Sequence, residues 1–231
     1  MAGGATRGWA RRVAGVAVGV ALVPTLAGCT GTNASAWVGS TDPAMPVMAV
    51  NADSITYYSY NQVLGLLGPD FRMKVDARVN ARADEHLASA ATYDEIDPVV
   101  VIVALGTNDL VQGQPVTDLR SDQLQILDNY GPTVGCVVYM TVFGDKHPYA
   151  VDSPEVDAYN AAVRALDGST ELGVTVQVAD WEQAVYDAGP DTVIADDVHP
   201  NDAGKVIFAD LLRAAVDECP AVPQPGDTPS V

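Results

Sequence analysis

The feature that most constrains the fold is a run of eight apolar residues at 98–105, PVVVIVAL. A near-continuous run rich in β-branched residues is typical of a strand that is buried on both faces of a parallel sheet. Strand-like and helix-like apolar spacings alternate along much of the remaining chain. Strands are predicted at 47–51, 71–77, 98–105, 133–142 and 173–179, and helices at 57–67, 84–91, 118–130, 155–166 and 203–219. This alternation predicts an α/β fold in which helices cover both faces of a parallel sheet.

The first thirty residues have the composition of an export signal. Residues 1–12 contain three arginines and no acid, and residues 13–26 are almost wholly apolar or small. That apolar stretch is too short to cross a bilayer comfortably, and it fits the h-region of a signal peptide. It ends in the sequence LAGC at 26–29, which resembles the lipobox of bacterial lipoproteins. An ordinary secretory signal, or an uncleaved anchor helix, is the alternative interpretation.

The lipobox resemblance implies how the chain is organised. In such lipoproteins the cysteine receives a diacylglyceryl group and the signal peptide is cut just before it. The mature chain is then expected on the extracytoplasmic face of the cell membrane, held there by a lipid anchor. Small polar residues after Cys29 predict a flexible tether, and four prolines near the end predict a disordered tail. The expected parts are a signal peptide at 1–28, lipidated Cys29 with its tether at 29–45, a folded domain at 46–219 and a Pro-rich tail at 220–231.

Charge and cysteine content narrow the possible partners. Acids outnumber bases 30 to 12, which argues against nucleic acid because phosphate binding needs a basic surface. The common nucleotide-binding motifs and the Cys/His spacings of zinc sites are absent from the sequence. Once Cys29 carries lipid, Cys136 and Cys219 are the remaining cysteines, and in an exported chain they are expected to form a disulfide. The alternative is a buried free thiol at Cys136.

Three polar segments carry the candidate chemistry. They are 51–56 (NADSIT), 105–109 (LGTND) and 196–201 (DDVHPN), and the first two directly follow predicted strands. In open α/β sheets, ligands bind beyond the carboxyl ends of the strands. Taken singly, the segments have structural explanations: a helix cap, a turn and a surface loop. Together they supply a hydroxyl, an amide and an Asp/His pair, which are the groups needed for acyl transfer.

In these segments the chain resembles the SGNH/GDSL-type serine hydrolases. The sequence DSIT at 53–56 resembles the nucleophile block of that family, LGTND at 105–109 its Gly-x-Asn-Asp block, and DDVHP at 196–200 its Asp-Gly-x-His-Pro block. The resemblance implies a three-layer α/β/α sandwich with a flavodoxin-like parallel sheet, and an ester hydrolase that uses a Ser-Asp-His triad. It also implies that no metal or organic cofactor is required.

The resemblance assigns a role to each matching residue. Ser54 would attack the ester carbonyl, His199 would act as general base and then general acid, and Asp196 would orient the imidazole. The backbone N–H of Ser54 and the side-chain amide of Asn108 would form the oxyanion hole.

The sequence departs from the family pattern at three positions. Ala52 stands in place of a glycine before the nucleophile block, and Asp197 replaces the glycine of the third block, where a second carboxylate would favour a protonated His199. The family's further oxyanion glycine has no clear match. Asn80 is the best position, because asparagine tolerates a left-handed backbone, and Ala81 is its rival.

Several aromatic and histidine residues remain ambiguous. Tyr57, Tyr58 and Tyr60 follow the nucleophile, and they either form a sugar-stacking platform or pack a helix. Trp181 either walls an acyl pocket or belongs to the core. His86 and His147 are expected to be exposed and without a catalytic role.

The function predicted from the sequence is an extracytoplasmic, membrane-tethered serine esterase. Its expected substrates are short acyl esters, such as acetyl esters, on a small molecule or an acylated glycan. An O-acyltransferase that uses the same triad is a close variant. The alternative from another class is a catalytically silent binding or scaffolding lipoprotein that retains the fold, which the departures at Ala52, Asn80 and Asp197 would favour.

Overall fold

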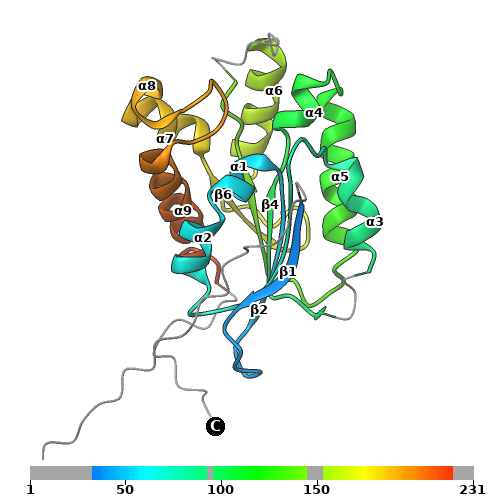
Figure 1. Ribbon diagram of the computed structural model, residues 1–231. Helices are drawn as coiled ribbons and strands as arrows, with labels where there is room; N and C mark the ends of the chain where they lie inside the picture. The colour runs from blue at the N-terminus through cyan, green and yellow to red at the C-terminus, as the bar shows by residue number, and fades with distance from the viewer. Residues whose placement is uncertain (1–32, 93–95, 145–152, 221–231) are drawn as a thin grey trace, which may run out of the picture. The chain divides into compact units, whose positions relative to one another are not determined.

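The computed structural model describes residues 33–92, 96–144 and 153–220, and these residues belong to one compact unit (Figure 1). The expected signal peptide, Cys29, His147 and nearly all of the Pro-rich tail lie outside the described residues. Within the described ranges, no helix combines the length and the hydrophobicity that crossing a membrane requires.

The core of the fold is a six-stranded sheet with the order β1-β3-β2-β4-β5-β6. All the neighbouring strands from β3 to β6 pair in parallel, and this order is the flavodoxin-like arrangement. Every residue of β4 is buried, as the apolar run at 98–105 predicts. The strands are β1 (Asn33–Gly39), β2 (Val47–Ala52), β3 (Arg72–Arg78), β4 (Val100–Ala104), β5 (Cys136–Met140) and β6 (Thr175–Ala179).

The edge strand β1 corrects two expectations. Residues 33–39 do not belong to a flexible tether, and the sheet is mixed rather than wholly parallel, because β1 pairs antiparallel with β3. The pairing runs from Asn33 opposite Arg78 to Gly39 opposite Arg72. Backbone hydrogen bonds hold this edge strand, and apart from Trp37 and Val38 its residues are small or polar, so the composition of the segment concealed the strand. The folded domain therefore begins before residue 46.

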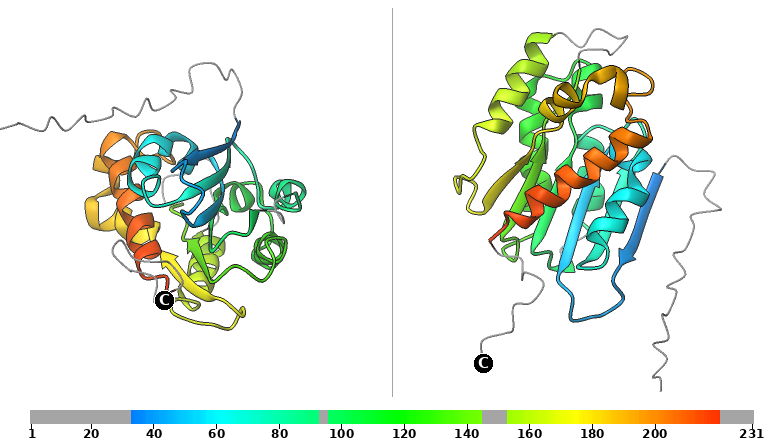
Figure 2. Two further views of the ribbon diagram at one scale, coloured as in Figure 1. Left: turned by 90° about the horizontal axis from the view of Figure 1, so that it is seen from below. Right: turned by 90° about the vertical axis from the view of Figure 1, so that its left-hand side faces the viewer.

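Helices cover both faces of the sheet, as Figure 1 and the two views of Figure 2 show. On one face, helices α1, α2, α7, α8 and α9 contribute to a core cluster that includes Leu67, Trp181 and Phe208. On the other face, α3, α4, α5 and α6 contribute to a second cluster that includes Ile126 and Tyr159. The helices are α1 (Ser54–Tyr58), α2 (Tyr60–Leu67), η1 (Asp84–His86), α3 (Leu87–Ala90), α4 (Thr107–Val111), α5 (Val116–Asp128), α6 (Ser153–Arg164), α7 (Trp181–Ala188), α8 (Pro190–Val193) and α9 (Asp202–Asp217).

A disulfide ties the end of α9 to the sheet, and an aromatic contact joins α9 to α7. Cys136 at the start of β5 and Cys219 just beyond α9 form a disulfide, the pairing predicted from the sequence, with their Cα atoms 5.7 Å apart. Trp181 is fully buried and packs edge-to-face against Phe208 of α9, with ring centroids 5.4 Å apart. Trp181 therefore belongs to the core, which leaves it no surface with which to wall an acyl pocket.

Candidate active site

The nucleophile segment is a tight turn from β2 into α1. Asp53 caps α1, and its Oδ1 accepts a hydrogen bond of 2.9 Å from the backbone N–H of Ile55. Ser54 is the first residue of the helix, so its own backbone N–H is among those that have no partner inside the helix. Ala52 ends β2 and is not among the residues with positive φ, so the methyl group that replaces the family's glycine is accommodated in an extended strand.

The structure brings Ser54, His199 and Asp196 into one hydrogen-bonded row. His199 Nε2 lies 2.8 Å from Ser54 Oγ, across 145 positions of sequence, and His199 Nδ1 lies 2.9 Å from Asp196 Oδ2. The Asp196 carboxylate also accepts a hydrogen bond of 2.8 Å from the backbone N–H of His199. The loop itself is closed by a hydrogen bond from Ala195 N to His199 O, so the three-residue offset places both side chains together.

The electrostatics of this row favour a charged Asp196 beside the imidazole. Burial alone would raise the pKa of Asp196, but hydrogen bonds from the ring and the backbone of His199 outweigh it and lower the pKa. The carboxylate therefore stays ionised at neutral pH and can stabilise an imidazolium. Asp197, expected to add a second carboxylate, adopts a left-handed φ of 71° with an exposed side chain. Among the described residues, the hydrogen-bond partners of the His199 ring are Asp196 and Ser54.

The segment after β4 is joined to the loop after β3 by a hydrogen bond. Gly106 has a φ of 137°, and a Cβ there would lie 3.2 Å from Tyr159 and Val142, so the turn requires glycine. Beyond it, Asn108 Nδ2 donates a hydrogen bond of 3.0 Å to the carbonyl of Ala81. An amide nitrogen has two N–H groups, which leaves the second for another acceptor.

The same loop contains the position expected to replace the family's oxyanion glycine. Asn80 has a φ of 64°, the left-handed conformation predicted for it, and its side chain is exposed. The neighbouring Ala81 is buried, and its carbonyl faces Asn108. The loop is also held at Ala83, whose backbone N–H donates 2.9 Å to Asp109 Oδ1.

Two carboxyl groups, one just before Ser54 and one in α4, are buried, which the sequence did not indicate. Asp53 is buried, and burial raises its pKa from 3.8 to about 7, with the charge of Asp109 acting in the same direction. Burial likewise raises the pKa of Asp109 from 3.8 to about 6. Both residues lie inside the recognised motifs, but their burial depends on the tertiary structure.

His86 corrects the expectation that it is exposed. It is fully buried, and its Nδ1 lies 3.5 Å from Oδ2 of the equally buried Asp76. Asp76 also accepts hydrogen bonds from Arg78 and Ser89. Burial alone would raise the pKa of Asp76, but hydrogen bonds from His86, Arg78 and Ser89 hold it well below its usual range. Asp76 precedes Asn80 in the chain, and His86 and Ser89 follow it, so these contacts hold together the two ends of the loop that contains Asn80.

The tyrosines divide between the site and the core. Tyr58 is 46% exposed, and its ring meets the His199 ring edge-to-face with centroids 4.9 Å apart. Tyr57 and Tyr60 are partly buried against the core. One tyrosine of the three therefore lies beside the imidazole, and the other two pack the helices.

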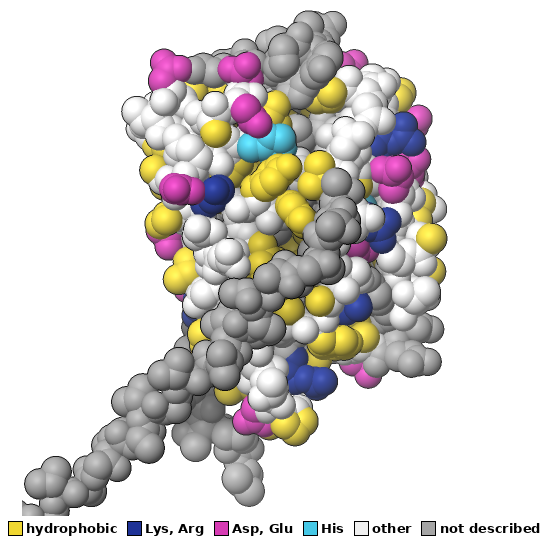
Figure 3. Space-filling model, viewed as in Figure 1, with side chains coloured by type: hydrophobic (Ala, Val, Ile, Leu, Met, Phe, Trp, Pro, Cys, Tyr) yellow, Lys and Arg dark blue, Asp and Glu magenta, His cyan; other side chains and the backbone are white. Residues whose placement is uncertain are grey.

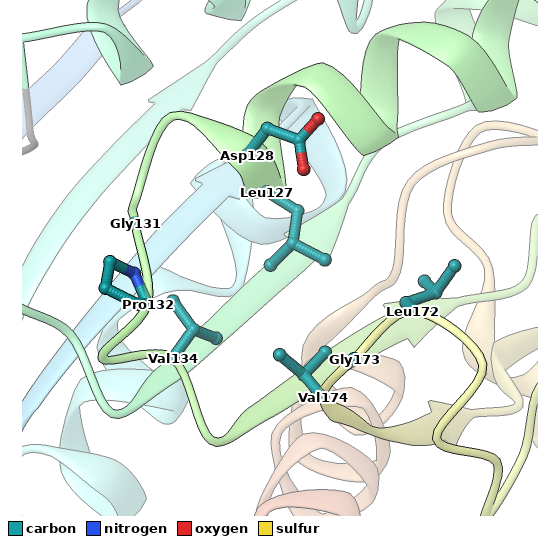
Figure 4. A pocket seen from close by; sticks show the side chains of 8 residues that line it. All are labelled: Leu127, Asp128, Gly131, Pro132, Val134, Leu172, Gly173 and Val174. Atoms are coloured by element: carbon teal, nitrogen blue, oxygen red, sulfur yellow. The ribbon is translucent and has the colours of Figure 1, made fainter.

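Features elsewhere are separate from this site. The described residues contain no group of three or more His, Cys, Asp or Glu side chains that could hold a metal ion. A pocket of about 320 Å³ lies between the loops that precede β5 and β6 (Figure 4). It is therefore at the amino ends of these strands, whereas Ser54 follows the carboxyl end of β2. Its lining includes Leu127, Pro132 and Val174 and offers no nucleophile or imidazole.

Comparison with solved structures shows the same fold in several ester-processing proteins. The catalytic domain of peptidoglycan O-acetyltransferase A from Streptococcus pneumoniae is 21% identical with a TM-score of 0.58, and the match covers 76% of this chain and 94% of that domain. A carbohydrate esterase of family 3 from Talaromyces cellulolyticus is 20% identical with a TM-score of 0.58, covering 75% and 97%. A member of the lipolytic G-D-S-L family from Veillonella parvula is 18% identical with a TM-score of 0.61, covering 76% and 100%.

Comparison by sequence gives the family. No curated protein matches the chain. The model of the GDSL-like lipase/acylhydrolase family matches residues 1–207, which is most of the chain and includes all three motif segments. The chain therefore belongs to the GDSL-like lipase/acylhydrolase family.

Proposed function

We propose that this protein is a membrane-tethered, extracytoplasmic serine esterase that removes short acyl groups, of the acetyl type, through an acyl-enzyme on Ser54. The observation that carries the proposal is the 2.8 Å contact between Ser54 Oγ and His199 Nε2, with Asp196 on the opposite ring nitrogen. This is the arrangement that activates a hydroxyl as a nucleophile.

In the first half of the reaction, Ser54 Oγ attacks the ester carbonyl carbon while His199 Nε2 accepts the hydroxyl proton. The charged Asp196 holds Nδ1 protonated and stabilises the imidazolium. The tetrahedral intermediate collapses, the bond to the alcohol oxygen breaks, and His199 returns the proton to the departing alcohol. The acyl group is then bonded to Ser54.

The negative charge of the intermediate falls on the former carbonyl oxygen. The Ser54 backbone N–H and the second N–H of the Asn108 amide are the donors proposed for it, and the backbone N–H of Asn80 is the third. Each such donor typically contributes about 3–4 kcal/mol of barrier lowering. The left-handed φ of Asn80 supports its assignment, because it is the backbone conformation expected of a residue that takes the place of the family's glycine.

In the second half, water attacks the acyl-enzyme with His199 as base, releasing a carboxylic acid and free Ser54. If a sugar hydroxyl takes the place of water, the same intermediate gives acyl transfer. The structural likeness to the catalytic domain of a peptidoglycan O-acetyltransferase keeps this second function open. Acetyl release and acetyl transfer to a peptidoglycan fragment, measured together, decide between the two.

An acylated glycan is the proposed natural substrate. The exposed ring of Tyr58 beside His199 offers a surface on which a sugar ring can stack. The likeness to a carbohydrate esterase supports the same class of substrate.

The test uses a fluorophosphonate probe and p-nitrophenyl acetate with the wild type and Ser54→Ala. We expect stoichiometric labelling and turnover in the wild type, and neither in Ser54→Ala. Ser59→Ala is the matched control, since Ser59 is another buried serine and lies one residue past the end of α1. A wild-type protein that neither labels nor turns over substrate between about pH 6 and 9 refutes the enzyme and leaves the binding lipoprotein.

The membrane tether is tested separately through Cys29. Cys29→Ser removes the thioether on which the diacylglyceryl anchor depends, so we expect the protein to leave the membrane fraction. Retention of Cys29→Ser in the membrane contradicts the lipoprotein assignment without affecting the esterase proposal.

A further inference from the structure

The chain enters the folded domain at the carboxyl ends of the parallel strands, where Ser54 and Asn108 lie. We call this end of the sheet its catalytic edge. Because β1 is antiparallel to β3, its first residue, Asn33, pairs with Arg78, the last residue of β3. The parallel strands β2 and β4 end at the same edge, where Ser54 and Asn108 follow them. Figure 2 shows the start of β1 at the end of the sheet where α1 lies, and the turn from β1 into β2 at the opposite end.

The covalent path from Cys29 to this edge is short. Three residues, 30–32, separate Cys29 from Asn33. Four extended residue steps span at most about 14 Å. The entry point of β1 therefore lies within about 14 Å of the Cα atom of Cys29, the residue that would carry the lipid.

We propose that the lipid anchor orients the domain, so that its catalytic edge faces the bilayer and acts on esters carried by membrane-anchored molecules. This inference rests on the proposed tether at Cys29 and deepens the proposed function by naming where the substrate is held. Without β1, the same anchor would be joined to a long flexible segment and would impose no orientation.

The negative charge of the domain determines how near the site can come to the membrane surface. Asp196, Asp197 and Asp202, close to His199 in the chain, are exposed, and Figure 3 shows acidic side chains along the upper rim of the domain. Removal of residues 1–28 takes away three arginines and changes the formal charge from −18 to −21. Anionic headgroups repel such a rim over a Debye length of about 8 Å. The short tether keeps the catalytic edge close to the bilayer, and the repulsion keeps it from entering the bilayer. The substrate ester is therefore on a hydrophilic sugar or headgroup and not on an acyl chain within the hydrocarbon.

The orientation is measured by energy transfer in vesicles that hold the full-length lipidated protein. A donor dye is attached at Gln112→Cys, exposed after α4 at the catalytic edge, or at Glu171→Cys, exposed in the loop before β6 at the opposite edge. The native Cys136 and Cys219 are disulfide-bonded and do not react with the dye. A five-residue strand such as β6 separates the two edges by about 17 Å. We expect clearly stronger transfer from position 112 to an acceptor on the lipid headgroups. Equal transfer, or stronger transfer from position 171, overturns the proposal.

Lengthening the tether isolates its contribution. Twenty Gly/Ser residues inserted between Gly31 and Thr32 give an end-to-end distance of about 25 Å. We expect this insertion to abolish the difference between the two labels, and the same insertion after Pro220 to leave it intact. A difference that survives the first insertion shows that something other than the tether orients the domain, and it refutes the inference.

The substrate part of the proposal has its own measurement. Soluble 4-methylumbelliferyl acetate is compared with the same acetyl ester attached to a phosphatidylethanolamine headgroup in the same vesicles. The tether insertion should reduce hydrolysis of the headgroup-linked ester about fivefold, through lower effective concentration, and leave the soluble ester unchanged. Equal rates on the headgroup-linked ester with and without the insertion contradict the proposal. If neither ester is hydrolysed while energy transfer still differs between positions 112 and 171, the result contradicts the esterase and not the orientation. Failure of the proposed function and failure of this inference can therefore be told apart.

Discussion

The buried carboxyl of Asp53 makes the stability of this domain depend on pH in a defined direction. Its pKa in the folded protein is about 7, against an ordinary value of 3.8, because burial disfavours the charged form. Between these two values the folded state binds more protons than the unfolded state. The free energy of unfolding therefore falls as the pH rises through this range, and the full loss is present above pH 7.

The size of this effect follows from the two pKa values. The difference between about 7 and 3.8, at about 1.4 kcal/mol per pH unit, corresponds to about 4 kcal/mol. Many domains have a total stability of about 5–15 kcal/mol, so this is a large fraction. Asp53→Asn removes the titration but keeps a side-chain oxygen that can cap α1 through Ile55, and asparagine caps helices about as well as aspartate.

The measurement is urea unfolding of the chain from residue 31 onward, with its disulfide intact, at several pH values from 4 to 8. We expect the stability of Asp53→Asn relative to the wild type to rise by up to about 4 kcal/mol over this range. The difference between the two proteins cancels the titrations that they share. Parallel stability profiles would show that Asp53 is already charged in the folded state, and would refute the burial argument.

Three further predictions concern other parts of the site and the fold. Asn108→Ala should lower kcat about 10²–10³-fold in p-nitrophenyl acetate hydrolysis with little change in KM, and a larger change in KM than in kcat would contradict its oxyanion role. Replacing Cys136 and Cys219 together by serine should lower the free energy of unfolding by about 4–5 kcal/mol, because the closed loop spans a sequence separation of 83; a loss below about 1 kcal/mol in urea unfolding would count against this. Tyr58→Ala should reduce kcat/KM by about tenfold at most through the lost contact with His199, whereas Tyr58→Phe keeps the ring and should retain the wild-type value.

The parallel part of the fold could be predicted because its strands carry a strong local signal. The run at 98–105 is apolar at every position, and β4 lies inside it with every residue buried. The edge strand β1 has no such signal. Apart from Trp37 and Val38, its residues are small or polar, and it is held by backbone pairing with β3. Nothing in its local sequence indicates that β3 has an unpaired side available to it.

The same contrast holds at the site. Ser54, Asn108 and His199 follow the order and spacing of known motifs, so their meeting at one sheet edge could be predicted before any coordinates. The burial of Asp53 and His86 could not, because it depends on which segments cover them in three dimensions. His86 in particular follows two acids, a context that favours an exposed side chain, yet Asp76 of β3 lies within 3.5 Å of it.

The disulfide helps to hold the helix that follows the general base, His199. His199 lies just before the first turn of α9, and the cysteine bridge ties the far end of that helix to β5. A helix of sixteen residues is about 24 Å long. The disulfide therefore holds the C-terminal end of α9, and the N-terminal end of the same helix positions the loop that contains His199. Thiols stay reduced in the cytosol, where this bond does not persist. In the exported protein that we propose, this bond forms after transport to an oxidising compartment, so the far end of α9 is tied to β5 only there.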